Sequence, residues 1–462
     1  MNRIVVVGGG ITGLAAAHRV GELNPLAKVT LLEASSRLGG TIQTEYRDGF
    51  LLERGPDSFI SEKPEALALA KRLGLESRLI QTNETYRRSF IVRNGRLRAV
   101  PDGFQLLAPS RMWPFITSDI FSLAGKARMA ADLFLPRKST NGDESLASFV
   151  RRRLGEEALA RMAQPMVGGI YTADPETLSL RATLPRFLDM EQKHRSLILA
   201  MLRAGRSQKT GTSGARYSLF LSFDRGMQVL VDAVTRINAD FRVKTRVQRL
   251  SLGQGWTIST DQGEEFKADA ICLALPAYVA ASLLSDVNEL LAEKLRQIKY
   301  ASTATINFGY RRSAIKHPLN GFGFVVPVIE NRSLIACTFS SVKFADRAPN
   351  DHVLLRAFAG GALQPEVFAL DESQLSDRVE ADLRELLDIR EDPRFIEVAK
   401  WERSMPQYEV GHLDRVNEIE KLVGEIPGLA LAGNSYRGAG IPDCIRSGEA
   451  AAEKLATDEH GL

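Results

Sequence analysis

The first forty residues contain a glycine-rich turn between two apolar segments. The segment GGGITG at 8–13 follows the apolar run IVVV and precedes an Ala-rich stretch over 14–23. A second apolar run then ends at Glu33, twenty residues after Gly13. This order predicts a strand, a tight turn, a helix, a second strand and an acid, which together form the βαβ unit of a dinucleotide site.

The residue types in this unit suit the phosphates and the ribose of a dinucleotide. Gly8 permits the tight turn, Gly10 lets the backbone approach a pyrophosphate, and Gly13 lets the helix pack closely on the strand. The exposed N–H groups at the start of the helix face the phosphates, and the acid can accept the ribose hydroxyls. The cofactor contacts expected from this unit are Gly8, Gly10, Ile11, Thr12, Gly13, Glu33 and Ala34.

The segment after Glu33 favours a flavin over a nicotinamide. A nicotinamide enzyme would normally continue into another helix and strand, whereas here Arg37 and the pair Gly39-Gly40 follow. In flavoproteins with two dinucleotide-binding folds, this extension is a second glycine turn under the cofactor's phosphates. Arg37 would supply a fixed positive charge, and the glycines would allow a close backbone approach. A plain turn is the alternative interpretation of the glycine pair.

A second set of cofactor contacts is expected near the end of the chain. An apolar run over 429–432 leads into a glycine-rich loop, and a helix is expected to follow through 449–455. The N-terminal amides of such a helix suit an anionic or electron-rich group such as the flavin ring. The first and last segments would then meet in one FAD domain. The contacts expected here, with one from the strand over 247–250, are Gly433, Ile441, Pro442 and Val247.

Composition limits the class of protein and its partners. With 462 residues, 44% hydrophobic and 25% charged, the chain is long enough for two to three domains of an ordinary soluble protein. A net charge of +4 is a poor indication of nucleic acid, but it is compatible with an anionic substrate or a weak contact with a membrane surface. The longest uncharged apolar run, 271–284, contains Pro276 and is too short to cross a bilayer. We expect a cytoplasmic protein without a signal peptide, monomeric or homodimeric, either free or peripheral on the inner face of the cell membrane.

The three cysteines indicate neither a disulfide framework nor a metal site. Cys272 and Cys337 lie in apolar runs and are expected to be buried thiols. Cys444 lies in the C-terminal glycine-rich segment, where it is either a covalent flavin anchor or a packing residue. The packing alternative is preferred, so FAD is expected to bind non-covalently and no metal is expected.

The pattern along the chain predicts an α/β protein (α+β overall): a two-dinucleotide-binding FAD fold with a mixed-sheet substrate domain and a helical insert. Basic residues gather at Arg151–Arg153 and over 193–216, as a solvated face or a surface for anions. Helical spacing is found over 67–73, 122–135, 146–162 and 196–204, and a polar loop over 207–214. The expected division is an FAD domain of 1–80, 220–283 and 423–462, a substrate domain of 81–92 and 284–422, and a helical, membrane-surface-like domain of 93–219.

Six motifs spread over the chain resemble a known family. They are GGGITGLAAAHRV, EASSRLGGTIQT, ERGPDSF, FDRGMQVLVDAV, PQYEVGHLDRV and LAGNSYRGAGIPDCIRSGEAAA. Together they resemble the oxygen-dependent porphyrinogen oxidases of haem biosynthesis, which act on protoporphyrinogen IX or coproporphyrinogen III. The first two motifs also occur in the wider amine oxidase and phytoene desaturase superfamily. The resemblance implies an FAD-dependent oxidoreductase that acts on CH–CH donors with dioxygen as acceptor.

The resemblance also implies roles for individual residues. Gly169 matches the glycine whose backbone carbonyl lies beside the reacting methylene of the substrate. Val325, Thr338 and Phe358 match apolar pocket positions, and Thr338 departs from the leucine common in plant members. Plant members hold a substrate propionate with an arginine, but Ser89 falls on the aligned position here and Arg88 is the neighbouring candidate. Ordinary core packing is the alternative interpretation of Val325 and Phe358.

The expected chemistry requires no nucleophile, and the sequence shows no nucleophile–base constellation. A hydride leaves a bridging methylene for the flavin, a pyrrole N–H proton departs, and three such two-electron steps give the porphyrin. Dioxygen reoxidises the flavin each time and yields hydrogen peroxide. The protein must hold a wide apolar macrocycle near the flavin and exclude water.

Alternatives differ in substrate or in class. GIPDCI resembles the coproporphyrinogen-oxidising members, whereas FSSVKFADRAP resembles a stretch of the plant enzymes, and protoporphyrinogen IX is slightly preferred. A flavin amine oxidase would usually frame the flavin with two aromatic side chains, but Tyr436 has no identifiable partner. A carotenoid desaturase would carry longer apolar segments. A non-catalytic flavin-binding module is the alternative from a different class.

Overall fold

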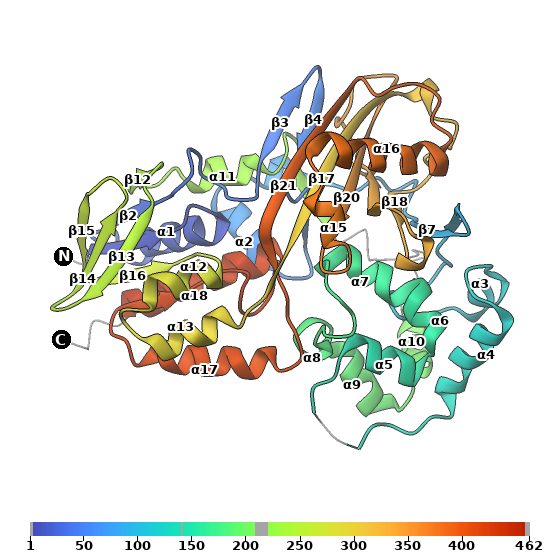
Figure 1. Ribbon diagram of the computed structural model, residues 1–462, viewed down its shortest axis with the longest axis horizontal. Helices are drawn as coiled ribbons and strands as arrows, with labels where there is room; N and C mark the ends of the chain where they lie inside the picture. Colours follow the sequence, from blue (N-terminus) through green and yellow to red (C-terminus); the bar gives the residue numbers. More distant parts are fainter. Residues whose placement is uncertain (1–2, 140–141, 208–219, 458–462) are drawn as a thin grey trace.

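The computed structural model describes residues 3–139, 142–207 and 220–457. Figure 1 shows a parallel sheet with its helices at the left, a larger sheet at the upper right and a group of helices at the lower right. The polar loop expected over 207–214 lies outside the described residues except for Ser207. Among the described residues, no helix is both long and apolar enough to cross a membrane.

The parallel sheet joins strands from distant parts of the chain. Its strand order is β12-β2-β1-β16-β22, and all neighbours run parallel. A parallel sheet is covered on both faces, so its strands need apolar side chains on both sides. The apolar runs that were predicted as strands meet this need and lie in this sheet. The bounds are Asp240–Arg242 for β12, Lys28–Leu32 for β2, Arg3–Val7 for β1, Ala270–Leu273 for β16 and Leu429–Leu431 for β22.

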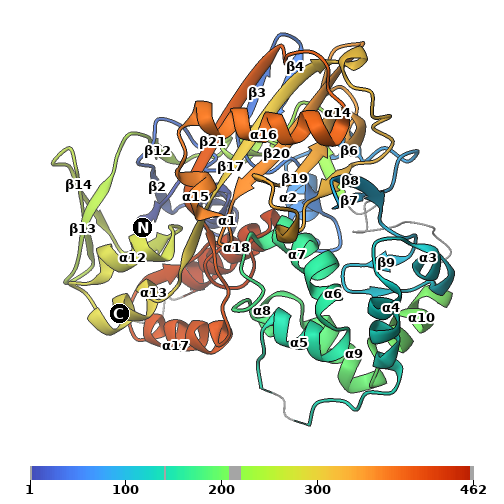
Figure 2. The same cartoon turned by 45° about the vertical axis from the view of Figure 1, so that its right-hand side comes forward.

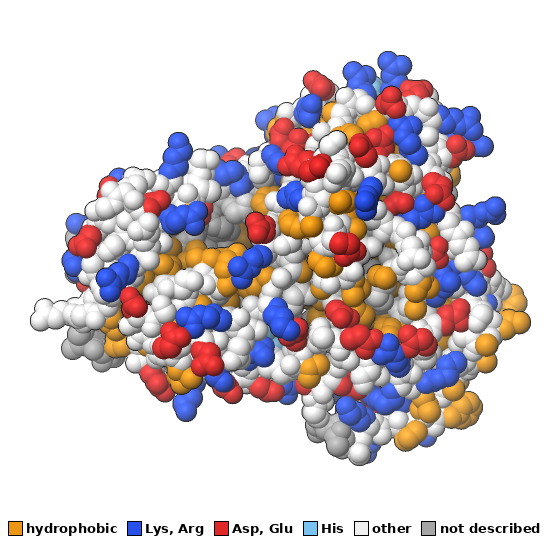
Figure 3. All heavy atoms as spheres, in the orientation of Figure 1, with side chains coloured by type: hydrophobic (Ala, Val, Ile, Leu, Met, Phe, Trp, Pro, Cys, Tyr) orange, Lys and Arg blue, Asp and Glu red, His pale blue; other side chains and the backbone are white. Residues whose placement is uncertain are grey.

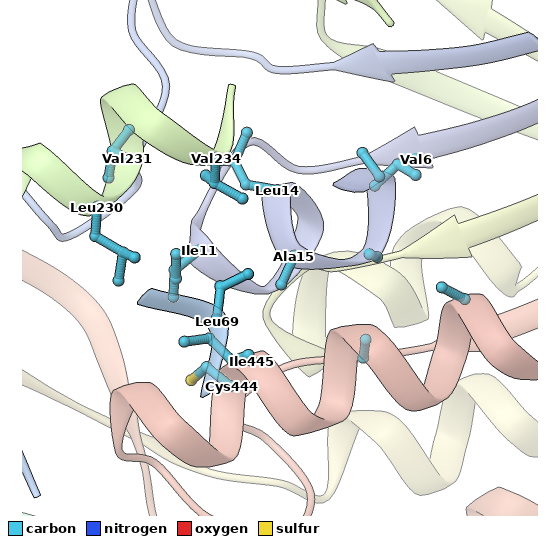
Figure 4. Packing of buried hydrophobic residues seen from close by; sticks show 14 of the residues in the cluster. Val6, Ile11, Leu14, Ala15, Leu69, Leu230, Val231, Val234, Cys444 and Ile445 are labelled. Carbon is cyan, nitrogen blue, oxygen red and sulfur yellow. The ribbon is translucent and has the colours of Figure 1, made fainter. Parts of the chain in front are cut away.

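Two helices, α1 (Ile11–Leu23) and α18 (Ile441–Thr457), pack together on one face of this sheet. A Cβ atom added to Gly448 would lie 2.2 Å from the carbonyl oxygen of Thr12, so only glycine allows this approach. Figure 4 shows Ile11 and Ile445 in the core between the two helices. The first and last segments of the chain therefore share one core.

The opposite face of the parallel sheet has a separate core, which Val5 and Ile271 share with Trp256 and Leu291. It is covered by β13 (Val247–Leu252), β14 (Trp256–Thr260) and β15 (Glu265–Ala268), with α12 (Ala277–Leu284), α13 (Glu289–Arg296) and α17 (His412–Gly424). Further along the first core lie α2 (Glu65–Arg72), α11 (Gln228–Val234) and a small sheet of β5 (Phe59–Ile60), β11 (Phe220–Phe223) and β6 (Leu79–Gln81).

The larger sheet has the order β21-β17-β20-β19-β18-β7-β8 and is mixed, because β18 and β7 run parallel. Helix α16 (Glu372–Leu387) covers one face, where Leu375 and Leu383 share a core with Ile306 and Leu355. The strands are β21 (Phe395–Pro406), β17 (Tyr300–Arg311), β20 (His352–Gly360), β19 (Leu334–Phe339), β18 (Gly323–Val325), β7 (Phe90–Arg93) and β8 (Arg96–Ala99). The β7–β8 hairpin crosses the division expected between residues 92 and 93.

The helical part differs from its prediction in one place. The single helix expected over 146–162 is wrong: α5 (Leu146–Arg153) ends before Gly155, whose φ is +94°. The missing Cβ at Gly155 leaves room for Arg128, whose guanidinium donates to the last carbonyls of α5. The other α-helices of this part and a π-helical turn are α3 (Met112–Thr117), α4 (Leu123–Ala130), α6 (Glu156–Ala158), the π-helical turn (Leu159–Ala163), α7 (Gln164–Tyr171), α8 (Leu180–Thr183), α9 (Pro185–His194) and α10 (Leu197–Ser207).

The basic run at the end of α5 is held by acids and is not a free cationic face. Arg153 is fully buried, and its Nε donates to Asp132 at 2.6 Å. Arg152 binds Glu144 and Glu191, and Arg151 binds Glu156 and Glu176. This run therefore stabilises the helical part internally.

Candidate functional site

The two glycine turns expected to hold phosphates lie against each other beyond the carboxyl end of β1. The N–H of Gly39 donates to the carbonyl of Gly9 at 2.8 Å, and Gly10 pairs with Gly39 as an isolated parallel bridge. Gly8 and Gly39 both have φ of +108°, a conformation that side chains rarely adopt. The turns thus form one continuous backbone surface at the place where open parallel sheets bind ligands.

Gly10 and Gly13 have different surroundings. A Cβ at Gly13 would lie 1.9 Å from the carbonyl oxygen of Gly8, so this glycine is required for packing. A Cβ at Gly10 would come no closer than 4.0 Å to any atom, the nearest being Cα of Gly40. Helix α1 has no side-chain cap and no acidic residue in its first turn. This cradle and the uncapped amides at Ile11 and Thr12 fit a pyrophosphate.

Glu33 and Arg37 fix the edges of this surface. The Glu33 carboxylate accepts the N–H groups of Gly9 and Ser35, each at 2.7 Å, which leaves further lone pairs for ribose hydroxyls. The Arg37 guanidinium donates to the carbonyl of Gly40 at 2.6 Å and to that of Ile42. Arg37 therefore shapes the second glycine turn while it places a positive charge beneath it.

Three further expected contacts, Ala34, Val247 and Gly433, lie at the two ends of this surface. The exposed Ala34 follows Glu33 directly, and the N–H of Thr245 donates to the Glu33 carbonyl at 2.8 Å. That bond brings the half-buried Val247 close to the expected ribose end of a dinucleotide. At the other end, the N–H of Gly433 donates to Ser447 Oγ at 3.0 Å, which holds the strand end against α18.

The start of α18 is built around a buried acid. Asp443 lies in its first turn, where Lys63 Nζ binds Oδ2 at 2.5 Å and Arg446 binds Oδ1 at 2.7 Å. Ile441 and Pro442 precede it and are buried. Cys444 points into the core with Ile11 (Figure 4), and burial raises the pKa of its thiol to about 11.

Three expected substrate residues share one face of the larger sheet. Val325 pairs with Ala336, which pairs with Phe358 on the next strand. Thr338 lies two residues after Ala336 and so faces the same side. Val325, Thr338 and Phe358 are half-buried, whereas the alternate residues of these strands are buried under α16. The face with Val325, Thr338 and Phe358 is therefore open to a ligand, whereas the opposite face is covered by α16.

Gly169 lies against this face. A Cβ at Gly169, which is exposed on α7, would be 3.7 Å from Cγ1 of Val325. Both ends of α7 are fastened to the sheet: Val328 N–H donates to Gln164 Oε1 at 3.0 Å, and Ala362 N–H donates to the Thr172 carbonyl at 2.8 Å. Figure 2 shows α7 between the sheet and the other helices of the insert.

The end of α7 also lies near the start of α18. Burial, followed by the negative charge of Asp443, raises the pKa of Tyr171 to about 12. Tyr171 is two residues after Gly169, and Asp443 is one residue after Pro442. Tyr171 at the end of α7 and Asp443 at the start of α18 are therefore within electrostatic reach of one another.

Arg88 is not brought together with the other expected substrate residues. Its side chain is exposed, its backbone N–H donates to the Tyr86 carbonyl at 2.7 Å, and its carbonyl accepts the N–H of Phe322 at 2.9 Å. Strand alternation places Ser89 on the side of Ile91 and Val325, and it places Arg88 on the opposite side. The carbonyl of Arg88 helps to hold the start of β7 beside the segment that leads into β18.

The sequence interpretation missed a buried charge cluster on the Phe358 face. Lys343 Nζ binds Asp57 at 2.9 Å, Arg356 lies 3.5 Å from the same carboxylate, and the Arg356 guanidinium covers the Phe358 ring at 4.7 Å. Burial opposes ionisation of Asp57, but the two cations outweigh it and hold its pKa well below the usual range. The alternation in RAFAGG could have placed Arg356 beside Phe358, but nothing local pointed to Asp57.

The segment that carries Asp57 connects the two large sheets. Asn307 Nδ2 donates to the Glu53 carbonyl at 3.2 Å, and Trp401 Nε1 donates to the Arg54 carbonyl at 2.9 Å. Arg356 donates to the Gly55 carbonyl. A Cβ at Gly55 would lie 1.7 Å from the carbonyl oxygen of Thr41, which follows Gly40, so the motif ERGPDSF packs between the larger sheet and the second glycine turn.

Comparison with known proteins places this geometry in context. The chain matches the family model of flavin containing amine oxidoreductases over residues 11–456. Coproporphyrinogen III oxidase of Bacillus subtilis is 37% identical, with 98% of each chain covered. Chloroplastic protoporphyrinogen oxidase of Nicotiana tabacum is 30% identical, over 96% of this chain and 83% of the relative. The crystal structure of a "putative protoporphyrinogen oxidase" from Exiguobacterium sp. 255-15 has a TM-score of 0.89 and 32% identity, with 99% of both chains covered.

Proposed function

The chain belongs to the flavin-containing amine oxidoreductase family, and on that premise we propose that it is an FAD-dependent porphyrinogen oxidase. The observation that carries the proposal is the close approach of Gly169 to Val325, on a sheet face that also presents Phe358. This half-buried face suits one side of a flat macrocycle. Tyr171, at the end of the helix that carries Gly169, is within electrostatic reach of Asp443 at the start of α18. The names of the relatives at 37% and 30% identity supply the substrate class.

FAD is proposed to bind non-covalently across the two glycine turns and the start of α18. The open space at Gly10 and the uncapped start of α1 support the pyrophosphate position. Cys444 supports the absence of a covalent bond, because its thiol is buried in the core between α1 and α18. When bound, the flavin supplies the two-electron acceptor for each oxidation step.

The residues of the chain orient the substrate for this reaction. The Gly169 carbonyl is proposed to face the reacting methylene, while Val325 and Phe358 hold the plane of the macrocycle. The pyrrole N–H proton leaves as each hydride is transferred, and dioxygen is the proposed final acceptor, with hydrogen peroxide as the product. Covering the apolar face keeps water from the reacting carbon.

Coproporphyrinogen III is proposed as the preferred substrate. The relatives named coproporphyrinogen III oxidase are 37%, 35% and 31% identical to this chain, and the plant protoporphyrinogen oxidases reach 30%. This changes the slight preference for protoporphyrinogen IX drawn from the stretch FSSVKFADRAP. The test is to follow porphyrin fluorescence in air with both substrates. A higher kcat/KM for protoporphyrinogen IX would reverse the assignment, and no gain over autoxidation with either would refute the porphyrinogen activity.

A peripheral membrane contact is proposed at the outer edge of the helical part. Figure 3 shows apolar side chains gathered there, at the right-hand and lower right edges of the molecule. Trp113 and Ile116 on α3, Leu123 on α4 and the nearby Phe134 are 74%, 52%, 85% and 80% exposed. Arg111 and Arg137 are exposed beside them, which favours anionic lipid headgroups.

Vesicle sedimentation tests this contact. Wild type is expected to pellet with vesicles that contain phosphatidylglycerol, and the double variant Trp113→Ser with Leu123→Ser is expected to stay in solution. The control is Leu26→Ser, which removes a leucine that is 75% exposed on the opposite part of the molecule. Equal pelleting of wild type and the double variant would refute this contact.

A further inference from the structure

A short loop precedes α18, and its backbone is held by side chains from outside the cofactor sheet. The loop, residues 433–440, needs positive φ at Gly433 (+135°) and Gly438 (+130°). A Cβ at Gly438 would lie 2.3 Å from the carboxyl carbon of Asp443, so the loop fits tightly against the start of α18. Its position therefore decides where the residues proposed to face the flavin lie.

Tyr408 bridges the two ends of this loop. Its hydroxyl accepts the N–H of Gly438 at 2.9 Å and donates to the carbonyl of Asn434. The side chain is buried, and burial raises the pKa of the phenol well above its usual range. The hydroxyl therefore remains protonated and keeps both bonds.

His412 holds the middle of the same loop. Its ring stacks on Tyr408 with centroids 4.1 Å apart and an interplanar angle of 14°, and its Nε2 bonds the Tyr436 carbonyl at 2.8 Å. Since a carbonyl only accepts, Nε2 carries the proton. Burial lowers the pKa of His412 to about 4, so the ring is neutral near pH 7.

The backbone of this segment is bonded to the helical part that carries Gly169. The N–H of Ser179 donates to the Tyr408 carbonyl at 2.7 Å, and the N–H of Val410 donates to the Thr177 carbonyl at 2.9 Å. The N–H of Gly411 donates to Asp143 Oδ2 at 3.0 Å. Residues 407–412 thus touch the helical part with their backbone and the loop with their side chains.

We propose that Tyr408 and His412 are positioning residues that hold the loop before α18, and with it the flavin ring, at a set distance from Gly169. This inference rests on the proposed function, because it takes the ring to lie at the start of α18. Hydride transfer needs the reacting atoms about 3–3.5 Å apart, and a displacement of about 1 Å costs roughly 100-fold in rate. Neither side chain need touch the substrate.

The test compares variants that remove one bond each. Tyr408→Phe removes the hydroxyl but keeps the stacked ring, and His412→Leu removes the donor. Both are expected to lower kcat about 10- to 100-fold with KM for the porphyrinogen within about two-fold. They should also change the visible circular dichroism of the bound flavin and weaken FAD binding. His412→Gln can still donate from a similar position and is expected to restore most of kcat.

The control is Tyr46→Phe, which removes the 3.0 Å hydrogen bond from the Tyr46 hydroxyl to the Arg225 carbonyl, far from the loop. This variant should leave kcat, KM, the flavin circular dichroism and FAD binding unchanged. If Tyr408→Phe lowers thermal stability but leaves kcat and the flavin spectrum at wild-type values, the positioning role is refuted and the bond is only structural. Flavin spectra and FAD affinity are measured without porphyrinogen, so they test this inference independently of substrate. A wild-type protein that binds no flavin would instead refute the proposed function.

Discussion

Gly169 on α7 lies over Val325 on β18, and a Cβ built on Gly169 would be 3.7 Å from Val325 Cγ1. The two residues are far apart in the sequence and belong to different parts of the fold. Their approach depends on the bonds that fasten both ends of α7 to the larger sheet. We propose that a macrocycle meets the chain beside these two residues.

Side chains added at Gly169 should reduce turnover without reducing stability. An alanine there makes ordinary van der Waals contact and replaces a helical glycine, so Gly169→Ala should leave the fold intact or stabilise it by about 0.5–1 kcal/mol. Gly169→Leu should fill the space before Val325 and lower kcat/KM at least about 10-fold. Thermal unfolding and porphyrin fluorescence separate the two effects. Full activity in Gly169→Leu would show that Gly169 is not part of the substrate site.

Alanine substitutions at Gly10 and Gly13 are matched tests of the proposed cofactor site. Gly13→Ala forces an atom to within 1.9 Å of the Gly8 carbonyl and should destabilise the apoprotein by about 1–3 kcal/mol. Gly10→Ala meets no atom within 4.0 Å, so the apoprotein should keep its stability while the Kd for FAD rises about 10-fold or more. Urea unfolding and flavin titration check both values. Wild-type FAD affinity in Gly10→Ala would place the pyrophosphate elsewhere.

The buried His412 should make the protein sensitive to acid. Its pKa is lowered by burial from 6.5 to about 4, so the unfolded chain binds the proton more readily. The stability it contributes is complete above pH 6.5 and is lost as the pH falls through 4, with a total of about 3 kcal/mol. In His412→Gln, the free energy of unfolding should fall less between pH 6.5 and pH 4. An unchanged slope would contradict the neutral buried ring.

Glu53 should make the folded protein less stable as the pH rises. Burial raises its pKa from 4.5 to about 7, although the Met227 N–H and the Thr44 hydroxyl both bond its carboxylate. The folded protein therefore holds this proton more tightly than the unfolded chain. The stability from this group is complete below pH 4.5 and is lost as the pH rises through 7, with a total of about 3 kcal/mol.

The test for Glu53 is the pH dependence of urea unfolding between pH 5 and pH 8. Glu53→Gln keeps an acceptor for Met227 and removes the titration, so its stability should decline less over this range. A carboxylate that is ionised at pH 5 in the folded protein, as seen by infrared spectroscopy against Glu53→Gln, would contradict the raised pKa.

The fold class is confirmed, and the two glycine turns proposed to hold the cofactor could be predicted from sequence. The turn around Gly8 and Gly13 was predictable because only glycine satisfies both the backbone conformation and the close packing there. The break at Gly155 was missed, because apolar spacing continues through it and Arg128, which bonds the last carbonyls of α5, comes from another helix. Local pattern describes one element at a time, and such contacts arise between elements.

The same limit applies to the substrate face. The family resemblance pointed to Val325 and Phe358 as pocket residues. Their alignment across one face of the sheet, however, depends on the pairing of three strands. The cluster of Asp57, Lys343 and Arg356 joins positions almost three hundred residues apart. No spacing rule in the sequence connects a loop carboxylate to two cations at that distance.

The most direct test is the response of the bound flavin to substrate without oxygen. Coproporphyrinogen III added anaerobically to the yellow protein should bleach the flavin absorbance, and air should restore it while hydrogen peroxide and porphyrin fluorescence appear. In Gly169→Leu the bleaching should be at least about 10-fold slower. A flavin that stays oxidised with both coproporphyrinogen III and protoporphyrinogen IX, but is bleached by an amine, would contradict the account.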